Sequence, residues 1–174
     1  MVKSDERRSE ILDRLADYVL AEGLSAASLR PLAEAADTSD RMLLYYFKDK
    51  AELIAATLDR ISGRLVVLLN QAAAPEPMKL DALRARLVDV LFEERIWPYL
   101  CLWLEIAARA ARDDPFYKEV GERLARGFLD WGEAQLDSPT SRARAADAAR
   151  LLTSIEGMVL LKSVGLEDVS RRAL

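Results

Sequence analysis

The chain has 174 residues, of which 51% are hydrophobic, so it can bury a sizeable core in one domain or two small ones. The net charge of −4 argues against indiscriminate coating of nucleic acid, but it leaves room for a local basic surface. There is no histidine and one cysteine, Cys101, which excludes a His-based triad, a Cys/His zinc site and an internal disulfide. We expect no metal and no cofactor.

No apolar run approaches the roughly 18 residues that a membrane helix requires, and no signal peptide opens the chain. The lone cysteine fits a reducing compartment. Together these features predict a cytoplasmic protein that does not contact a membrane.

The first predicted helix covers about residues 9–22, and Gly23 ends it at the position where glycine is favoured. Residues 1–7 are polar, and we expect them to fray. One apolar stripe gives the helix its inward face: Ile11, Leu12, Leu15, Tyr18 and Val19.

Residues 28–53 predict two short helices joined by a tight turn, followed by the capped start of a third helix. Ser28 and Ser39 stand where they can cap the two short helices. Asp37 lies in the turn and is one of the few non-glycine residues that tolerates a positive φ. Asp49 begins a capping box for the third helix. This is the helix-turn-helix arrangement, which places its second helix in the major groove of DNA.

The rest of the chain also has helical periodicity, interrupted by a proline-containing break at residues 72–79. Alternating strand patterns are nearly absent, and the tail at 165–174 is polar. The sequence therefore predicts an all-α protein. Its further helices are expected at about 50–70, 80–95, 96–112, 115–136 and 142–164.

The motif resembles the DNA-binding domain of the tetracycline-repressor (TetR) family of bacterial transcription regulators over residues 8–53. That family typically has the pattern T-x-R-x-I/L-A-x-x-A-G-V-S-x-x-x-L-Y-x-Y/H-F-x-x-K-x-x-L. Asp37, Thr38 and Leu44 depart from it, because they replace a glycine, a valine and the first tyrosine. The residues that match in register are Ser28, Arg30, Leu32, Ala33, Ala36, Ser39, Leu43, Tyr46, Phe47, Lys50 and Leu53.

The resemblance implies a set of DNA contacts at Ser28, Arg30, Ser39, Asp40, Arg41, Met42, Tyr45, Tyr46 and Lys50. Arg41 suits guanine, Asp40 suits the amino group of cytosine, and Met42 suits a thymine methyl group. Simpler roles stay open: Arg30 as a solvated side chain, Asp40 as a helix-dipole partner, and one tyrosine as core. Residues 1–53 carry eight Lys/Arg and eleven Asp/Glu, so the acids must lie away from phosphate.

The resemblance further implies a three-helix DNA-binding domain at 1–53 and a helical ligand-binding and dimerisation domain at 54–174. Large aromatic residues gather around a carboxylate in the second domain, which predicts an apolar ligand site, with plain core as the alternative. The ligand-site residues would be Phe92, Trp97, Trp103, Glu105 and Trp131. Gly157 allows close approach of helices from two subunits, and the predicted interface contains Phe128, Leu152, Ile155, Gly157, Met158 and Val159.

These features predict a ligand-responsive transcriptional regulator, most simply a repressor. It would bind a palindromic operator of double-stranded DNA as a homodimer, and a small, largely apolar effector would modulate it. An all-α enzyme would have only isolated carboxylates for its chemistry, so we expect no catalysis. The alternative is a helical protein-interaction domain whose helix-turn-helix no longer binds DNA.

Overall fold

The computed structural model describes residues 2–173, and within them the chain forms nine α-helices, one short 3-10 helix and no β-strand. The all-α prediction is therefore confirmed. The elements in order are α1 (Val2–Glu22), η1 (Leu24–Ala26), α2 (Leu29–Ala35), α3 (Asp40–Tyr46), α4 (Lys50–Ala72), α5 (Leu80–Leu91), α6 (Trp97–Ala110), α7 (Pro115–Ala134), α8 (Ser141–Ser163) and α9 (Glu167–Arg172).

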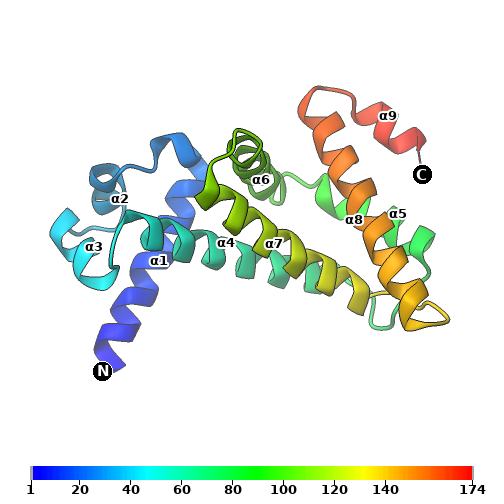
Figure 1. The fold of residues 1–174 in the computed structure, drawn as a ribbon, viewed down its shortest axis with the longest axis horizontal. Helices are drawn as coiled ribbons and strands as arrows, with labels where there is room; N and C mark the ends of the chain where they lie inside the picture. Colours follow the sequence, from blue (N-terminus) through cyan, green and yellow to red (C-terminus); the bar gives the residue numbers. More distant parts are fainter. Residues whose placement is uncertain (1, 174) are drawn as a thin grey trace.

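The molecule is elongated, with α1–α3 at one end and α5, α8 and α9 at the other (Figure 1). The long helix α4 runs from the first group towards the second. Helix α1 packs on α4, α6 packs on α7, and α8 packs on α7, α5 and α9. We call residues 2–49 the head and residues 73–173 the body; α4 connects them.

The local signals in the head act as the sequence predicts. Gly23 follows α1 with φ 76° and ψ 175°, a combination that is essentially limited to glycine. Asp37 has φ 51° in the turn between α2 and α3. Ser39 and Asp49 each accept a hydrogen bond from the backbone N–H three residues later, at 3.3 and 2.8 Å. These caps define where α3 and α4 begin.

Other boundaries differ from the prediction. Helix α1 begins at Val2, so the segment expected to fray is helical, and the Arg8 guanidinium lies 4.6 Å from the centre of the Phe47 ring. Ser28 occupies the N-cap of α2, but its side chain makes no capping hydrogen bond. The helix predicted to reach residue 95 ends at Leu91, and a turn follows in which Ile96 is fully buried.

Two hydrophobic clusters form the core and meet on α4. The first joins α1–α3 to α4 as far as Ile61 and includes three residues of the body, Leu102, Ile106 and Val120. The second begins at Leu65 and joins α4 to α5, α6 and α8. The domain boundary at residue 53 stays a prediction, and the head's core extends beyond it.

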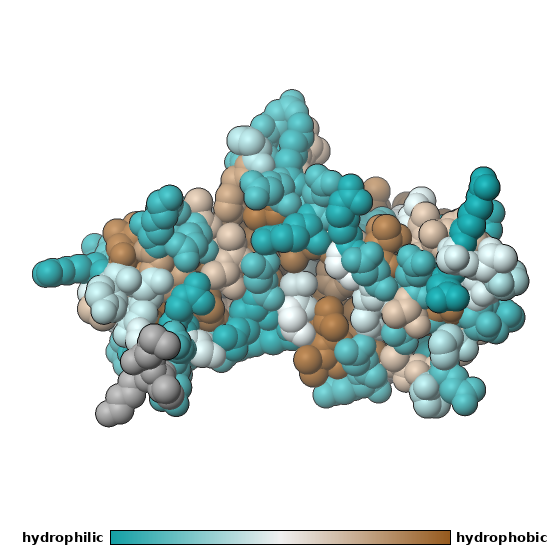
Figure 2. Space-filling view, turned by 60° about the horizontal axis from the view of Figure 1, so that its bottom comes forward, coloured by the Kyte–Doolittle hydropathy of each residue, from teal (hydrophilic) through white to brown (hydrophobic). Residues whose placement is uncertain are grey.

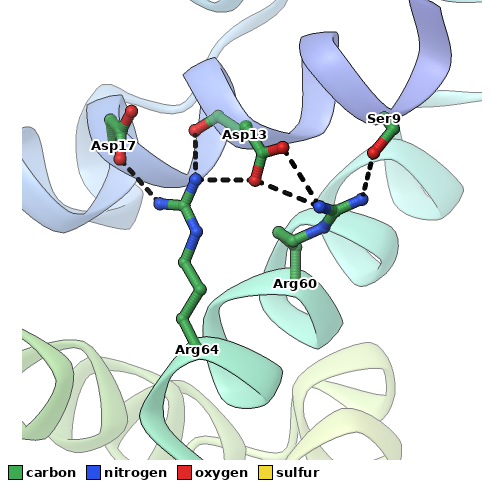
Figure 3. A network of polar contacts seen from close by, with 5 residues as sticks. All are labelled: Ser9, Asp13, Asp17, Arg60 and Arg64. Carbon is green, nitrogen blue, oxygen red and sulfur yellow. Dashed lines mark hydrogen bonds and ion pairs between the residues drawn. The ribbon is translucent and has the colours of Figure 1, made fainter. Parts of the chain in front are cut away.

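Two arginines of α4 fasten it to α1 (Figure 3). Arg60 donates to both carboxylate oxygens of Asp13 at 3.1 Å and to the Ser9 hydroxyl at 2.9 Å. Arg64 donates to the carboxylates of Asp13 and Asp17 at 2.7 and 2.6 Å, and to the Asp13 carbonyl at 3.1 Å. The contacts are partly shielded from water, so α1 and α4 are joined at two successive turns.

The surface is mostly hydrophilic where Figure 2 shows it, and its hydrophobic side chains lie there in separate patches. Between residues 2 and 173, no helix combines the length and the apolar character needed to cross a bilayer. The large apolar side chains therefore lie mainly inside the two clusters, and those that are exposed call for a separate explanation.

Candidate DNA-binding face and ligand cavity

Helix α3 exposes most of its side chains. Leu43 points into the core of the head and is fully buried, which fixes the orientation of the helix. This seven-residue helix nevertheless exposes large hydrophobic side chains to solvent. Tyr45, for example, is 73% exposed. An apolar surface of this kind is typical of a binding face. The exposed residues are Asp40, Arg41, Met42, Leu44 and Tyr45.

The two neighbouring tyrosines have different surroundings. Their rings meet edge to face with 5.2 Å between centroids. Tyr46 is partly buried against the head's core, whereas Tyr45 is exposed. Of the two, Tyr45 is therefore the freer to offer its hydroxyl group to a phosphate.

The remaining predicted DNA contacts also lie at this end of the molecule. Ser28, Ser39 and Lys50 are exposed at the starts of α2, α3 and α4. Arg30 is exposed on α2 and forms an ion pair with Glu34 at 3.2 Å, which a phosphate or base would have to replace. The structure brings together all nine residues predicted from the sequence, and among them only Tyr46 is not exposed.

More than half of the acidic residues of segment 1–53 lie in ion pairs. At least six of the eleven do so: Glu10, Asp13, Asp17, Glu34, Asp37 and Glu52. The partners of Asp13 and Asp17 are Arg60 and Arg64, which lie beyond residue 53. The acidic excess counted from the sequence of residues 1–53 therefore overstates the negative charge that faces a DNA backbone.

A partly open cavity of about 100 Å³ lies between α4 and the body, and its volume is several times what one water needs. Side chains of α4–α8 line it, and most of them are leucine, isoleucine or aromatic. Tyr99, Trp103, Phe128 and Trp131 provide the aromatic rings. Among the lining residues that the structure describes, Glu156 of α8 is the one with a formally charged side chain.

Glu156 has a neutral partner. The indole N–H of Trp103 donates to its carboxylate at 2.6 Å. Burial raises the pKa of Glu156 above its ordinary value, and the bond from Trp103 lowers it by less. The cavity is thus apolar apart from one carboxylate beside an indole ring.

The residues from 11 to 57 match the family model of bacterial regulatory proteins, tetR family. The match runs from α1 into α4, so the helix-turn-helix segment of the chain resembles that of the tetR family. Proteins of this family are DNA-binding regulators of transcription and not enzymes. None of the curated protein sequences matches the chain.

Solved structures share this fold over nearly the whole chain. A transcriptional regulator from Rhodococcus sp. Rha1 is 22% identical, with 95% of this chain and 90% of that chain covered and a TM-score of 0.71. Salmonella enterica GusR is 19% identical, with 95% and 87% covered and a TM-score of 0.66. The multidrug binding protein EbrR, in complex with proflavin, is 26% identical, with 97% of both chains covered and a TM-score of 0.64.

The predicted ligand-site residues separate into two groups. Trp103 and Trp131 line the cavity. Phe92 and Trp97 do not, because they hold Lys162, whose ammonium group lies 4.4 and 4.6 Å from the two ring centres. The same ammonium group donates to the Phe92 carbonyl at 3.0 Å. Phe92 and Trp97 therefore pack against the C-terminal end of α8, and the structure does not bring them to the cavity wall.

Glu105 also has a different role from the one predicted. Its carboxylate accepts a hydrogen bond from the Leu24 N–H at 3.0 Å. It lies so close to Gly23 that a Cβ atom there would be 2.6 Å from Oε1. Trp103 and Glu105 are two residues apart, about 200° around α6, so one side of the helix faces the cavity and the other contacts the head.

The cavity's carboxylate is Glu156, which the sequence reasoning missed. It has the feature that drew attention to Glu105, a lone acid in an apolar stretch of helix, here between residues 151 and 161. The two positions look alike in sequence, and only the packing of α6 and α8 distinguishes them.

The residues of the predicted dimer interface differ in their surroundings. Met158 is buried, and Gly157 is exposed. On the same side of α8 as Gly157, Leu160 and Val164 are also exposed. Four of the predicted residues line the cavity instead: Phe128, Leu152, Ile155 and Val159.

Proposed function

We propose that the protein is a cytoplasmic, homodimeric repressor that binds a palindromic operator through α3 and responds to a small, largely apolar effector in the body's cavity. The observation that carries this proposal is the exposed face of α3, presented by a buried Leu43 and a capped start. The match of residues 11–57 to the tetR family supports DNA binding in general. The dimer, the operator and the effector are our inferences.

The chemistry of α3 suits the major groove. Arg41 would bind the acceptor edge of guanine, Asp40 would accept from the amino group of cytosine, and Met42 would contact a thymine methyl group. Tyr45 and Lys50 flank these residues and would bind phosphates, with Lys50 aided by the dipole of α4. Two such heads in a dimer would bind half-sites about 34 Å apart, one helical turn of DNA.

A second subunit would cover the exposed side of α8. Gly157, Leu160 and Val164 form a continuous stripe, and Gly157 has no atom near the position of a Cβ, so another helix can approach closely. One helix-turn-helix buries too little DNA surface for tight specific binding, which favours two copies. A symmetric contact would use the same stripe twice.

Helix α6 would transmit the effect of effector binding from the cavity to the head, which binds the operator. It carries Trp103 on the cavity wall and Glu105 against the Leu24 N–H of the head. An effector that displaces Trp103 would move α6, and with it the contact at the base of the head. The proposed modulation therefore requires only a small shift of one helix between two packed clusters.

A binding titration tests the DNA contacts. The protein is titrated with the palindrome nearest its own gene and with a random duplex, over a salt series. Lys50→Ala should weaken both duplexes alike and lower the salt slope by about one. Arg41→Ala should cost about 1–3 kcal/mol on the operator and relax specificity at one position. Lys118→Ala and Arg142→Ala, on exposed sites of the body, should change neither the affinity for DNA nor the salt slope.

Sedimentation tests the dimer. Leu160→Arg should yield monomers, because a charge would then be buried against its symmetry mate. Val67→Arg is the matched control, since Val67 is 55% exposed on α4 and Leu160 is 56% exposed on α8. A wild-type monomer at micromolar concentration, or equal behaviour of the two variants, would contradict the proposed interface.

One observation also favours a protein-interaction domain that has lost DNA binding: Met42, Leu44 and Tyr45 make the surface of α3 apolar. The same titration separates the two functions. If the wild type binds operator and random duplex equally, and neither Arg41→Ala nor Lys50→Ala has an effect, α3 serves a protein partner and the repressor proposal fails.

A further inference from the structure

The cavity combines an aromatic wall with one carboxylate that has no cationic partner among the described lining residues, and we infer that its effector is a lipophilic organic cation whose positive group pairs with Glu156. This inference rests on the proposed role of the cavity as the effector site and specifies the class of molecule that fits it.

The first supporting observation is the distribution of charge on the side chains that line the cavity. Among the described residues that line it there is no lysine and no arginine, so Glu156 has no cation within the wall. Its hydrogen bond comes from the neutral indole of Trp103. The influences on its pKa are burial, which raises it, and this bond, with no contribution from a cationic side chain. A partly buried carboxylate in these surroundings gains most from a positive partner.

The second supporting observation is the position of the aromatic rings around the cavity. Tyr99, Trp103, Phe128 and Trp131 face the same space as the carboxylate. Aromatic faces attract cations, and most strongly where water is excluded. The protein already binds one of its own cations in this way, because Lys162 lies 4.4 and 4.6 Å from the ring centres of Phe92 and Trp97.

The alternatives fit the cavity less well. An anionic effector such as a fatty acid would place its negative charge beside Glu156, with no basic lining residue to offset it. A neutral effector would fill the apolar space but leave the carboxylate with its single indole donor. A cation that carries an aromatic or alkyl group would pair with the carboxylate and also pack against the apolar wall.

A pair of probes with one shape and two charges tests the inference. Benzyltrimethylammonium is a small aromatic cation, and neopentylbenzene is its neutral isostere, with carbon in place of the charged nitrogen. Calorimetric titration gives the affinity of each probe for the full-length protein. The wild type should bind the cation about 10- to 100-fold more tightly than the isostere.

Two variants locate the source of this preference. Glu156→Gln keeps the size of the side chain and an acceptor for Trp103, so it should retain the affinity for neopentylbenzene and lose the preference for the cation. Glu119→Gln is the matched control, because that carboxylate is exposed on α7 and does not line the cavity. It should keep the wild-type preference.

Several outcomes would overturn the inference: equal affinities in the wild type, tighter binding of the neutral probe, a preference that survives Glu156→Gln, or no binding of the cation at millimolar concentration. The same proteins are titrated with operator DNA in the absence of probes. If DNA binds but the cation is not preferred, only this inference fails. If no operator binds, the proposed function fails while the measured preference still reports on the cavity.

Discussion

The head and the body differ in where their large apolar side chains lie. In the head, Leu43 and Phe47 are almost completely buried, and the exposed apolar groups, such as Tyr45, lie on the outer side of α3. In the body, Trp103 and Phe128 are only partly buried and surround a cavity. The head thus presents a rigid surface outward, whereas the body keeps adaptable space inside. A DNA reader needs the first property, and an effector site needs the second.

The largest expected effect is a difference between leucines in the two regions. Leu43→Ala in the dense core of the head should cost about 3–5 kcal/mol of unfolding free energy, because it opens a new cavity. Leu151→Ala should cost about 2–3 kcal/mol, because Leu151 already borders a void. The two side chains are comparably buried, at 0% and 4% exposure. Urea unfolding measures both, and equal losses would show that the body is packed as densely as the head.

The contact between the head and the body should have the next largest effect on the free energy of unfolding. Gly23→Ala places a Cβ 2.6 Å from Glu105 Oε1 and strains a backbone with φ 76°, so we expect a loss of about 1–3 kcal/mol. Gly165→Ala is the control, since Gly165 has φ 82° and nothing within 4 Å of its Cβ position. Thermal unfolding of both variants isolates the contribution of the contact, and a control that loses as much as Gly23→Ala would refute it.

The pH dependence of stability should show a smaller effect. The pKa of Glu156 lies above its ordinary value of 4.5 in the folded protein, so the unfolded chain loses this proton first as pH rises. The contribution of Glu156 to stability therefore falls as pH increases from below 4.5 towards the raised value. Glu156→Gln should remove this decline and gain relative stability near neutral pH.

Urea titrations at several pH values measure the change. Glu119→Gln alters an exposed carboxylate of α7 and should follow the wild-type profile. A Glu156→Gln variant with the wild-type pH dependence would show that burial does not disfavour the charged form of this group.

The smallest expected effect is a gain. Gly63 lies within α4, between the head and the body, and a Cβ there would meet nothing within 4 Å. Gly63→Ala should therefore stabilise the protein by about 0.5–1 kcal/mol through the lower entropy of the unfolded chain. Denaturant midpoints check this value. A loss of stability would mean that the connecting helix needs flexibility at this point.

The head could be predicted in detail because its boundaries depend on local chemistry. Asp37, Ser39 and Asp49 act on backbone groups within a few residues of themselves, so their roles follow from the sequence alone. The start of α1 was missed because the contact between Arg8 and Phe47, which ties it to the fold, spans distant positions.

The body could be predicted only as a set of helices. Glu105 and Glu156 are both lone acids in apolar segments, and their different roles depend on how α6 packs between the head and α8. Residues 158–161 of α8 are all apolar, so periodicity could not show that Val159 faces inward while Leu160 faces water. Such assignments need the arrangement of several helices at once.

The paired arginines of α4 have a mechanical consequence. Arg60 and Arg64 bind α1 at points about 6 Å apart along the axis of α4. Helix α4 therefore cannot rotate or slide against α1 without breaking the hydrogen bonds of both arginines. Leu65 and Leu69, one and five residues after Arg64, form part of the cavity wall. Under the proposed function, an effector that presses on this wall would move α1 and α4 together, and α3 lies about 25 Å of helix away from these leucines. A small tilt of the joined helices at the cavity would then become a larger displacement of α3.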